Sequence, residues 1–414
     1  MHEIQKCIRT KRQIIFNIQD MKNTVDIDNL NTAFAFKSNK DLKYTYYIFK
    51  ILQYPKLLKL LTACANGIIK SNLPLKFVIK NTIFKIFCAG ETLRDAFGII
   101  KKLDKFHVKS VLDYVSEGES TEAVFEKNAN IITENIIQLG KECPGNYVSV
   151  KVSGLEDPLF LQKVNGHVFP TEPESAARFK KLYNRIDLIC KTAHQYKVIV
   201  YIDAEDRNMQ DILDALVEDM MAKYNKEEVI VFNTLQMYLK DRIAYLERVI
   251  KESDEKKYIP GIKLVRGAYV EKEREEARLK NIESPVFDKK EQTDASFNKA
   301  LEICLSSKGK IYTCVATHND QSTLLAVELI NKYNIEDHNK KVKFSQLYGM
   351  SDTLTFNLAA NGYNASKYLP YGEIKKAIPY LIRRAEENSS INGQITKELS
   401  GLGRELERRQ GAKK

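Results

Sequence analysis

Apolar and polar residues follow two different rhythms along this 414-residue chain. From residue 31 to about 105, apolar residues recur every three or four positions with lysines between them, which predicts helices. Beyond that, short runs rich in β-branched residues alternate with longer amphipathic stretches. The short runs predict eight strands, at 110–115, 147–153, 198–203, 229–233, 261–265, 310–316, 342–347 and 364–369. Helices are predicted between them, for example at 210–223, 237–251, 287–306 and 322–332.

Eight strands separated by helices indicate an α/β fold, a parallel (β/α)8 barrel of the TIM type with a helical N-terminal region. The competing architecture is a doubly wound open sheet. It would carry a glycine-rich phosphate loop after an early strand, and neither GxGxxG nor GxxxxGK[ST] occurs in the chain. The barrel is therefore the prediction.

Four regions are expected. Residues 1–30 form an extension without an assignment, and 31–107 a helical region packing on the barrel of residues 108–392. Residues 393–414 form a basic tail, for which we expect a solvated end; a short amphipathic helix for membrane or partner contact is the alternative. Either Met1 or Met21 could be the start.

The composition limits the functional classes. A net charge of +11 is spread along the chain, which attracts anions, acidic lipid surfaces included, and is weak support for nucleic-acid binding. No stretch approaches the roughly 20 apolar residues of a membrane span. The seven cysteines lack CxxC spacing, which favours a reducing compartment and buried thiols over disulfides or structural zinc.

Polar residues gather where the predicted strands end: Lys151, Asp203, Glu205, Gln236, Tyr348, Tyr368 and the segments 263–269 and 317–319. A single such residue is commonly structural, but one on nearly every strand would build a polar mouth on the barrel face that carries function. Gly267 and Ala268 are small enough for a planar ligand to approach the backbone. Neither HExxH nor GxSxG is present, so we expect no metal centre and no serine nucleophile elbow.

The segment YLPYGEIKKAIPYLIRRAEE (368–387) places Arg383 and Arg384 among apolar residues. Buried guanidinium groups need an anionic partner, and adjacent helical residues can approach one carboxylate from two sides. Pro379 fits the first turn of a helix, which would put both arginines near its positive end. The alternative is an ordinary helix whose arginines pair with Glu386 and Glu387.

Seven ordered motifs carry a resemblance to a known family. They are VSVKVSGL (148–155), IDAED (202–206), NTLQMYLK (233–240), GIKLVRGAYVEKERE (261–275), ATHND (316–320), LYGMSD (347–352) and YLPYGEIKKAIPYLIRRAEEN (368–388). From about residue 31 to 388 the chain resembles proline dehydrogenases, in their monofunctional form because there is no room for an aldehyde dehydrogenase module.

The resemblance implies a distorted barrel that holds FAD without a covalent bond. Asp203 and Lys263 take catalytic positions, with Lys263 near flavin N5. The substrate would contact Lys151, Tyr269, Leu347, Tyr368, Arg383 and Arg384, the arginines holding the proline carboxylate. The cofactor would contact Ala204, Gln236, Lys263, Val265, Arg266, Gly267, Ala268, Thr317, His318 and Asn319, while Glu387 holds Arg384. His318 without the resemblance would be a satisfied core histidine.

The implied reaction is the first step of proline catabolism to glutamate: a hydride equivalent passes from proline C5 to FAD N5, giving 1-pyrroline-5-carboxylate. Electrons then pass to a quinone, with peripheral membrane contact and no nucleic acid among the partners. Hydroxyproline oxidation is the nearest rival, and a large aromatic residue at Tyr368 favours proline. A basic barrel that binds nucleic acid without catalysis is the rival from another class.

We expect a cytoplasmic enzyme, with peripheral contact at the inner membrane, because Glu3 and Asp20 fit an organelle transit peptide poorly. The mitochondrial matrix is the alternative in a eukaryote.

Overall fold

The computed structural model describes residues 25–54, 80–115, 120–390 and 394–412. Within these ranges, the side chains of residue 81 and of residues 383–390 and 394 are not described.

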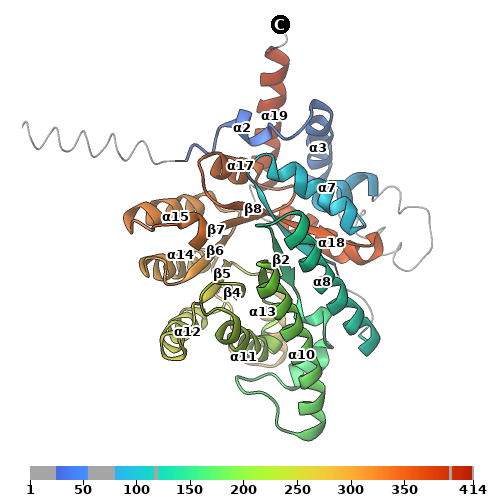
Figure 1. The fold of residues 1–414 in the computed structure, drawn as a ribbon. Helices are drawn as coiled ribbons and strands as arrows, with labels where there is room; N and C mark the ends of the chain where they lie inside the picture. Colours follow the sequence, from blue (N-terminus) through green and yellow to red (C-terminus); the bar gives the residue numbers. More distant parts are fainter. Residues whose placement is uncertain (1–24, 55–79, 116–119, 391–393, 413–414) are drawn as a thin grey trace, which may run out of the picture.

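A closed barrel of eight parallel strands forms the centre of the molecule, as predicted (Figure 1). The strands are β1 (Lys109–Tyr114), β2 (Tyr147–Val150), β3 (Ile199–Ile202), β4 (Val231–Gln236), β5 (Gly261–Val265), β6 (Tyr312–Ala316), β7 (Val342–Leu347) and β8 (Ala365–Tyr371). β8 pairs with β1 in parallel, with Val111 opposite Tyr368, and this pair closes the barrel. All eight carboxyl ends therefore lie on one face.

Helices surround the barrel (Figure 1). They are α8 (Glu122–Glu142), α9 (Pro158–Lys163), α10 (Pro173–Tyr196), α11 (Arg207–Tyr224), α12 (Arg242–Lys256), α13 (Val270–Leu279), α14 (Lys290–Ser306), α15 (Asp320–Lys332), α16 (His338–Lys341), α17 (Asp352–Ala360) and α18 (Ile374–Ser390). β5 and β7 have the predicted bounds, and the largest differences from the predicted bounds are in β2 and β4. β2 ends at Val150 because the 3-10 turn η2 (Val152–Gly154) follows, and β4 begins at Val231 and reaches Gln236.

The N-terminal region is helical, as predicted. Its elements are α2 (Leu30–Phe34), α3 (Asn39–Leu52), the π-turn η1 (Lys80–Phe84), α6 (Lys85–Phe87) and α7 (Leu93–Asp104). A second hydrophobic core joins Phe34, Phe49 and Phe87 of this region to Ala377 of α18 and Leu402 further on. The N-terminal helices are thus fixed to the barrel through burial of shared apolar surface.

The expected solvated C-terminal end is wrong. Residues Gln394–Gly411 form helix α19, which packs against α2 and α3 (Figure 1). Ile395 and Leu402 are buried on its inner face. Glu405 is fully buried as well, and its carboxylate accepts hydrogen bonds from Arg408 at 2.7 Å and Arg409 at 2.6 Å. Both arginines are thus paired with a buried acid on their own helix. The segment therefore presents less unpaired positive charge to solvent than its number of basic residues predicts.

The expected position of Pro379 in a first helical turn is also wrong. α18 begins at Ile374, directly after β8 and Gly372, so Pro379 lies inside the helix. Arg383 and Arg384 are therefore well beyond the first turn, and the helix dipole does not favour an anion there, because its effect is confined to the first and last turns.

Lys343 is a buried lysine inside the barrel whose ammonium group lies 5.6 Å from the ring centroids of both Phe232 and Tyr312. It donates a hydrogen bond to the Lys340 carbonyl at 2.6 Å. Burial lowers the pKa of Lys343 to about 8. Below pH 8 the ammonium is charged in both folded and unfolded states, so its desolvation opposes folding. Between pH 8 and the ordinary value the folded state loses the proton first, and stability rises with pH.

We expect Lys343→Met to stabilise the protein at pH 7 by about 1–3 kcal/mol, because an apolar chain of similar length removes this desolvation cost. Urea unfolding at pH 7 and pH 9.5 measures the change, and the variant should lack the rise between these values that the wild type shows. Lys299→Met, at an exposed position on α14, is the control. A Lys343→Met protein less stable at pH 7 than this control would contradict the assignment.

Candidate active site

A network of charged side chains lies at the carboxyl ends of the strands. Asp203, directly after β3, accepts a hydrogen bond from Lys263 at 2.7 Å and from the Tyr368 hydroxyl at 2.6 Å. Lys151, directly after β2, pairs with Asp113 of β1 at 2.9 Å and lies 3.9 Å from Asp203. Asp203 thus contacts three other predicted site residues, Lys151, Lys263 and Tyr368, although the four come from different strands or the turns that follow them.

The network favours the charged forms of Asp203 and Lys151. Burial by itself would raise the pKa of Asp203, but the ammonium groups of Lys263 and Lys151 lower it below its usual range. Burial opposes the charge of Lys151 too, and the carboxylates of Asp113 and Asp203 outweigh it and raise its pKa. Burial and these same carboxylates raise the pKa of Tyr368 well above its ordinary value, so its hydroxyl stays a donor.

The network's formal charges cancel, since two ammonium groups face two carboxylates. Lys263 is nearly buried, whereas the Lys151 side chain is 26% exposed and so reachable from the mouth. A bound anion would compete with Asp113 and Asp203 for Lys151, and it would need further cations to be held tightly.

A second group of predicted residues lies where β5 and β6 end. Arg266 donates from its three nitrogens to Asp294, Thr317 and Ser322 at 2.6, 2.6 and 2.9 Å. The Thr317 hydroxyl also accepts from the backbone N–H of Asn319, at 3.1 Å. Asn319 itself caps α15. This bonding fixes the loop after β6 in one conformation against β5.

Gln236, the last residue of β4, connects this rim to the loop after β3. Its amide donates to the Glu205 carbonyl at 2.7 Å, and its carbonyl accepts from the backbone N–H of Ala268 at 3.4 Å. Gly267 has a φ of +128°, and a Cβ there would lie 1.6 Å from a ring carbon of Tyr238. Only glycine fits, and the neighbouring Ala268 is an exposed residue.

His318 lies in the same loop as Thr317 and is partly exposed. Its Nδ1 is 2.8 Å from the Ser351 hydroxyl, and its Nε2 accepts from the backbone N–H of Leu347 at 3.4 Å. It is therefore no enclosed core histidine: it connects the loops after β6 and β7.

The other predicted residues have these places. Ala204 follows Asp203 and is partly exposed, as is Val265 at the end of β5. Leu347, at the end of β7, packs against the interior cluster that contains Tyr368. Tyr269 directly precedes α13 and lies near enough to Lys151 to influence its pKa. The side chains of Arg383, Arg384 and Glu387, together with the alternative pairing to Glu386, lie outside the described residues.

Sequence reasoning missed Asp113, which accepts from both Lys151 and Ser149. Its signal was a carboxylate in the middle of the otherwise apolar strand sequence SVLDYV, where an acid needs a partner. It also missed Ser351, which no strand-end position marked.

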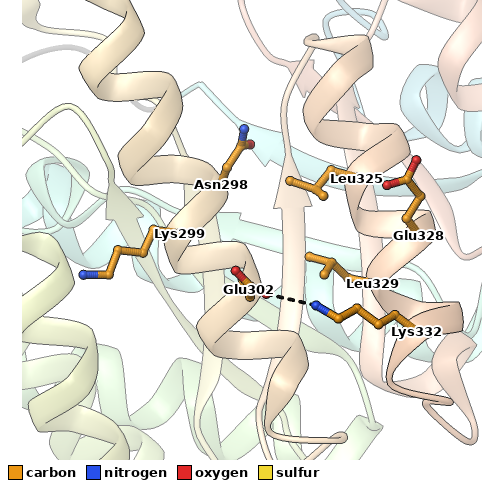
Figure 2. Close-up of a pocket in the computed structure, with 7 residues that line it drawn as sticks. All are labelled: Asn298, Lys299, Glu302, Leu325, Glu328, Leu329 and Lys332. Carbon is orange, nitrogen blue, oxygen red and sulfur yellow. Dashed lines mark hydrogen bonds and ion pairs between the residues drawn. The ribbon is translucent and has the colours of Figure 1, made fainter.

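A groove of about 570 Å³ lies elsewhere, between α14 and α15 on the outer surface (Figure 2). Its walls carry Asn298, Leu325 and Leu329, and an ion pair between Glu302 and Lys332 at 3.3 Å crosses it. It is open and lies on the helical layer, so none of the strand-end residues lines it.

Fold and site together define a (β/α)8-barrel enzyme with a charged, preorganised network at the strand ends. The profile of the family described as Proline dehydrogenase matches residues 96–397. "Proline dehydrogenase 1, mitochondrial" of Dictyostelium discoideum is 32% identical over 432 residues, covering 94% of this chain and 75% of that protein. The chain belongs to the proline dehydrogenase family and is an oxidoreductase, which confirms the prediction.

Two further similarities add detail. "Hydroxyproline dehydrogenase" of Xenopus laevis is 28% identical, over 91% of this chain and 89% of that protein. Among solved structures, proline utilization A (PutA) from Bdellovibrio bacteriovorus has a TM-score of 0.68 at 21% identity. The match covers 90% of this chain but only 40% of that longer chain, and it supports the barrel fold.

Proposed function

We propose that the protein oxidises L-proline to 1-pyrroline-5-carboxylate with bound FAD as the electron acceptor. Membership of the proline dehydrogenase family supports the substrate. The observation that carries the site assignment is the contact between Lys151, Asp203, Lys263 and Tyr368 at one barrel face. The four residues come from strands far apart in sequence, and the same motifs that carry the family resemblance contain them.

The residues on the β4–β6 side of the mouth fit a flavin. They are Gln236, whose carboxamide is bonded to the Glu205 carbonyl and the Ala268 N–H, the exposed residue Ala268, and the cation of Lys263. Gly267 keeps the adjoining backbone free of a side chain, which a flat ring system requires for close approach. Arg266, Thr317, His318 and Asn319 would hold the remaining parts of the cofactor. When bound, FAD supplies the redox chemistry by accepting a hydride equivalent from proline C5.

This chain's own residues bind and orient the substrate. Lys151, whose side chain is partly exposed, would pair with the proline carboxylate, and Arg383 with Arg384 would supply the further cations that a bound anion needs beside the neutral network. Asp203 holds Lys263 and the Tyr368 hydroxyl in fixed positions, so that Tyr368 and Leu347 form an apolar wall for the ring. The ammonium group of Lys263 would favour the build-up of negative charge on the reduced cofactor.

The purified protein, supplied with FAD, is expected to be yellow and to lose that colour when proline is added without oxygen. Absorbance near the flavin bands measures the reduction, and succinate, which lacks the ring nitrogen, is the control. A colourless protein that is inert to proline after FAD has been supplied would overturn the proposal.

Hydroxyproline is the second candidate substrate, because a hydroxyproline dehydrogenase matches most of the chain. Tyr368 is 8% exposed and its hydroxyl is held by both Lys151 and Asp203, so its ring is fixed and leaves little room for an added hydroxyl. We therefore expect kcat/KM for proline to exceed that for hydroxyproline by at least about tenfold, an energy of about 1.4 kcal/mol. Steady-state rates with both amino acids test this, and faster turnover of hydroxyproline would reverse the assignment.

The onward acceptor is proposed to be a membrane quinone, reached by peripheral contact that the basic balance of the chain favours. None of the helices in the described ranges has the length and apolar character needed to cross a bilayer. Relatives from Dictyostelium and Arabidopsis are named as mitochondrial, which supports the matrix alternative over the cytoplasm.

A further inference from the structure

Helix α19 contacts both loops that hold His318. Lys397 pairs with Asp320, the first residue of α15, and the neighbouring Glu398 accepts a 2.6 Å hydrogen bond from the backbone N–H of Ser351. The Lys397–Asp320 pair is partly exposed and contributes little. The Glu398 contact is different, because the side chain is only 8% exposed and the bond is to a charged acceptor.

Ser351 is held in an unusual backbone conformation. It has a φ of +50° in the left-handed region, which costs energy for a residue with a Cβ. The bond from its N–H to Glu398 offsets this cost and selects the conformation. In that conformation its hydroxyl reaches Nδ1 of His318 at 2.8 Å.

The same contacts define the state of the imidazole. The backbone N–H of Leu347 can only donate, so Nε2 of His318 accepts. In the neutral ring the proton is then on Nδ1, which donates to the Ser351 hydroxyl. The Leu347 N–H thus sets the tautomer of His318, and the Ser351 hydroxyl, which receives the Nδ1 proton, helps to hold the ring in position.

Several charged groups surround Glu398. Asp352 pairs with the buried Lys367 at 2.9 Å and with Lys37 of the N-terminal region at 3.4 Å. Burial and the neighbouring Asp352 raise the pKa of Glu398, while Lys367 and Lys397 act in the opposite direction. A carboxylate kept in such surroundings needs its hydrogen-bond donor, which makes the Ser351 contact hard to replace by water.

We propose that Glu398 is a positioning residue for the flavin: through Ser351 it sets the orientation of His318 at the cofactor side of the barrel mouth. This inference rests on the proposed function, in which His318 contacts FAD. It gives α19 a role in cofactor binding, in addition to its packing against α2 and α3.

The test uses three variants of the full chain. Glu398→Ala removes the acceptor, Glu398→Gln keeps an oxygen that can accept from Ser351, and Glu407→Ala changes an exposed glutamate on the same helix. Apoprotein is titrated with FAD by flavin fluorescence, and the thermal midpoint of each apoprotein is measured separately. We expect Glu398→Ala to weaken FAD binding by about ten- to a hundredfold, which is the range for a hydrogen bond to a charged group. Glu398→Gln should stay within about threefold of wild type, and Glu407→Ala should be unchanged.

If Glu398→Ala does not fold, Ser351→Gly decides the question. Glycine accepts the positive φ and keeps the N–H, but it lacks the hydroxyl that orients His318. Its apoprotein should be as stable as wild type and bind FAD about tenfold more weakly.

The outcomes separate the two proposals. If Glu398→Ala lowers only the thermal midpoint and Ser351→Gly leaves the FAD affinity unchanged, Glu398 is merely structural and the inference is overturned. If the wild-type apoprotein does not bind FAD at all, the proposed function fails with it. Weaker FAD binding by Glu398→Ala and Ser351→Gly, together with near wild-type binding by Glu398→Gln, supports the inference.

Discussion

Replacing Asp203 by asparagine is expected to lower kcat/KM for proline by about two to three orders of magnitude. The change removes the negative charge that faces Lys263 at 2.7 Å and Lys151 at 3.9 Å, and it leaves the two ammonium groups to repel each other. Removing one partner of a largely buried ion pair costs about 3–5 kcal/mol. If this cost raises the free energy of the transition state, kcat/KM falls by the expected factor. Steady-state kinetics on flavin-loaded protein measure the loss.

Asp254→Asn is the matched control, because Asp254 is an exposed carboxylate on α12, away from the strand ends. Flavin content should be measured for both variants, so that lost activity is separated from lost cofactor. An Asp203→Asn enzyme with nearly full kcat/KM would show that the network has no part in turnover.

Replacing Arg384 by methionine is expected to raise KM for proline by about ten- to a hundredfold and to change kcat much less. One charge-assisted hydrogen bond to a carboxylate contributes about 1.5–3 kcal/mol, and a carboxylate bound in substrate and transition state alike affects mainly KM. In the described network the charges of Lys151 and Lys263 are already balanced by Asp113 and Asp203. A bound carboxylate therefore needs a further cation, and Arg384 would supply it.

The control is Arg278→Met, at an exposed position on α13 where the arginine pairs only with its helical neighbour Glu275 among the described residues. Pyrrolidine keeps the proline ring but lacks the carboxylate. Its KM should therefore change little, and to the same small extent, in both variants. An unchanged KM for proline in Arg384→Met would remove this arginine from the substrate site.

The barrel could be predicted from the sequence because its strands are short apolar runs that are hard to mistake for helices. β5 and β7 were placed to the residue, at 261–265 and 342–347. Boundaries failed where a polar residue belongs to the strand, as at Gln236 in β4, or where a turn continues an apolar run, as in η2 after Val150. Local composition does not distinguish these cases.

The site could be predicted in part, for a physical reason. Lys151 and Asp203 directly follow β2 and β3, Lys263 and Tyr368 lie within β5 and β8, and barrel geometry brings these positions together. Asp113 was missed because it is inside β1, and Glu398 because it comes from a helix that was expected to be solvated. Contacts of this kind join residues far apart in the chain, so the spacing of residues along the sequence does not predict them.

The pairing of β1 with β8 has a consequence for synthesis on the ribosome. Translation produces β1 long before β8, so β1 and β7 both expose unpaired backbone edges until Ala365–Tyr371 has emerged. Such edges invite association with other nascent chains. We therefore expect chaperones to bind the nascent chain during elongation. Slow translation near β8 should lengthen the interval in which the nascent chain can aggregate.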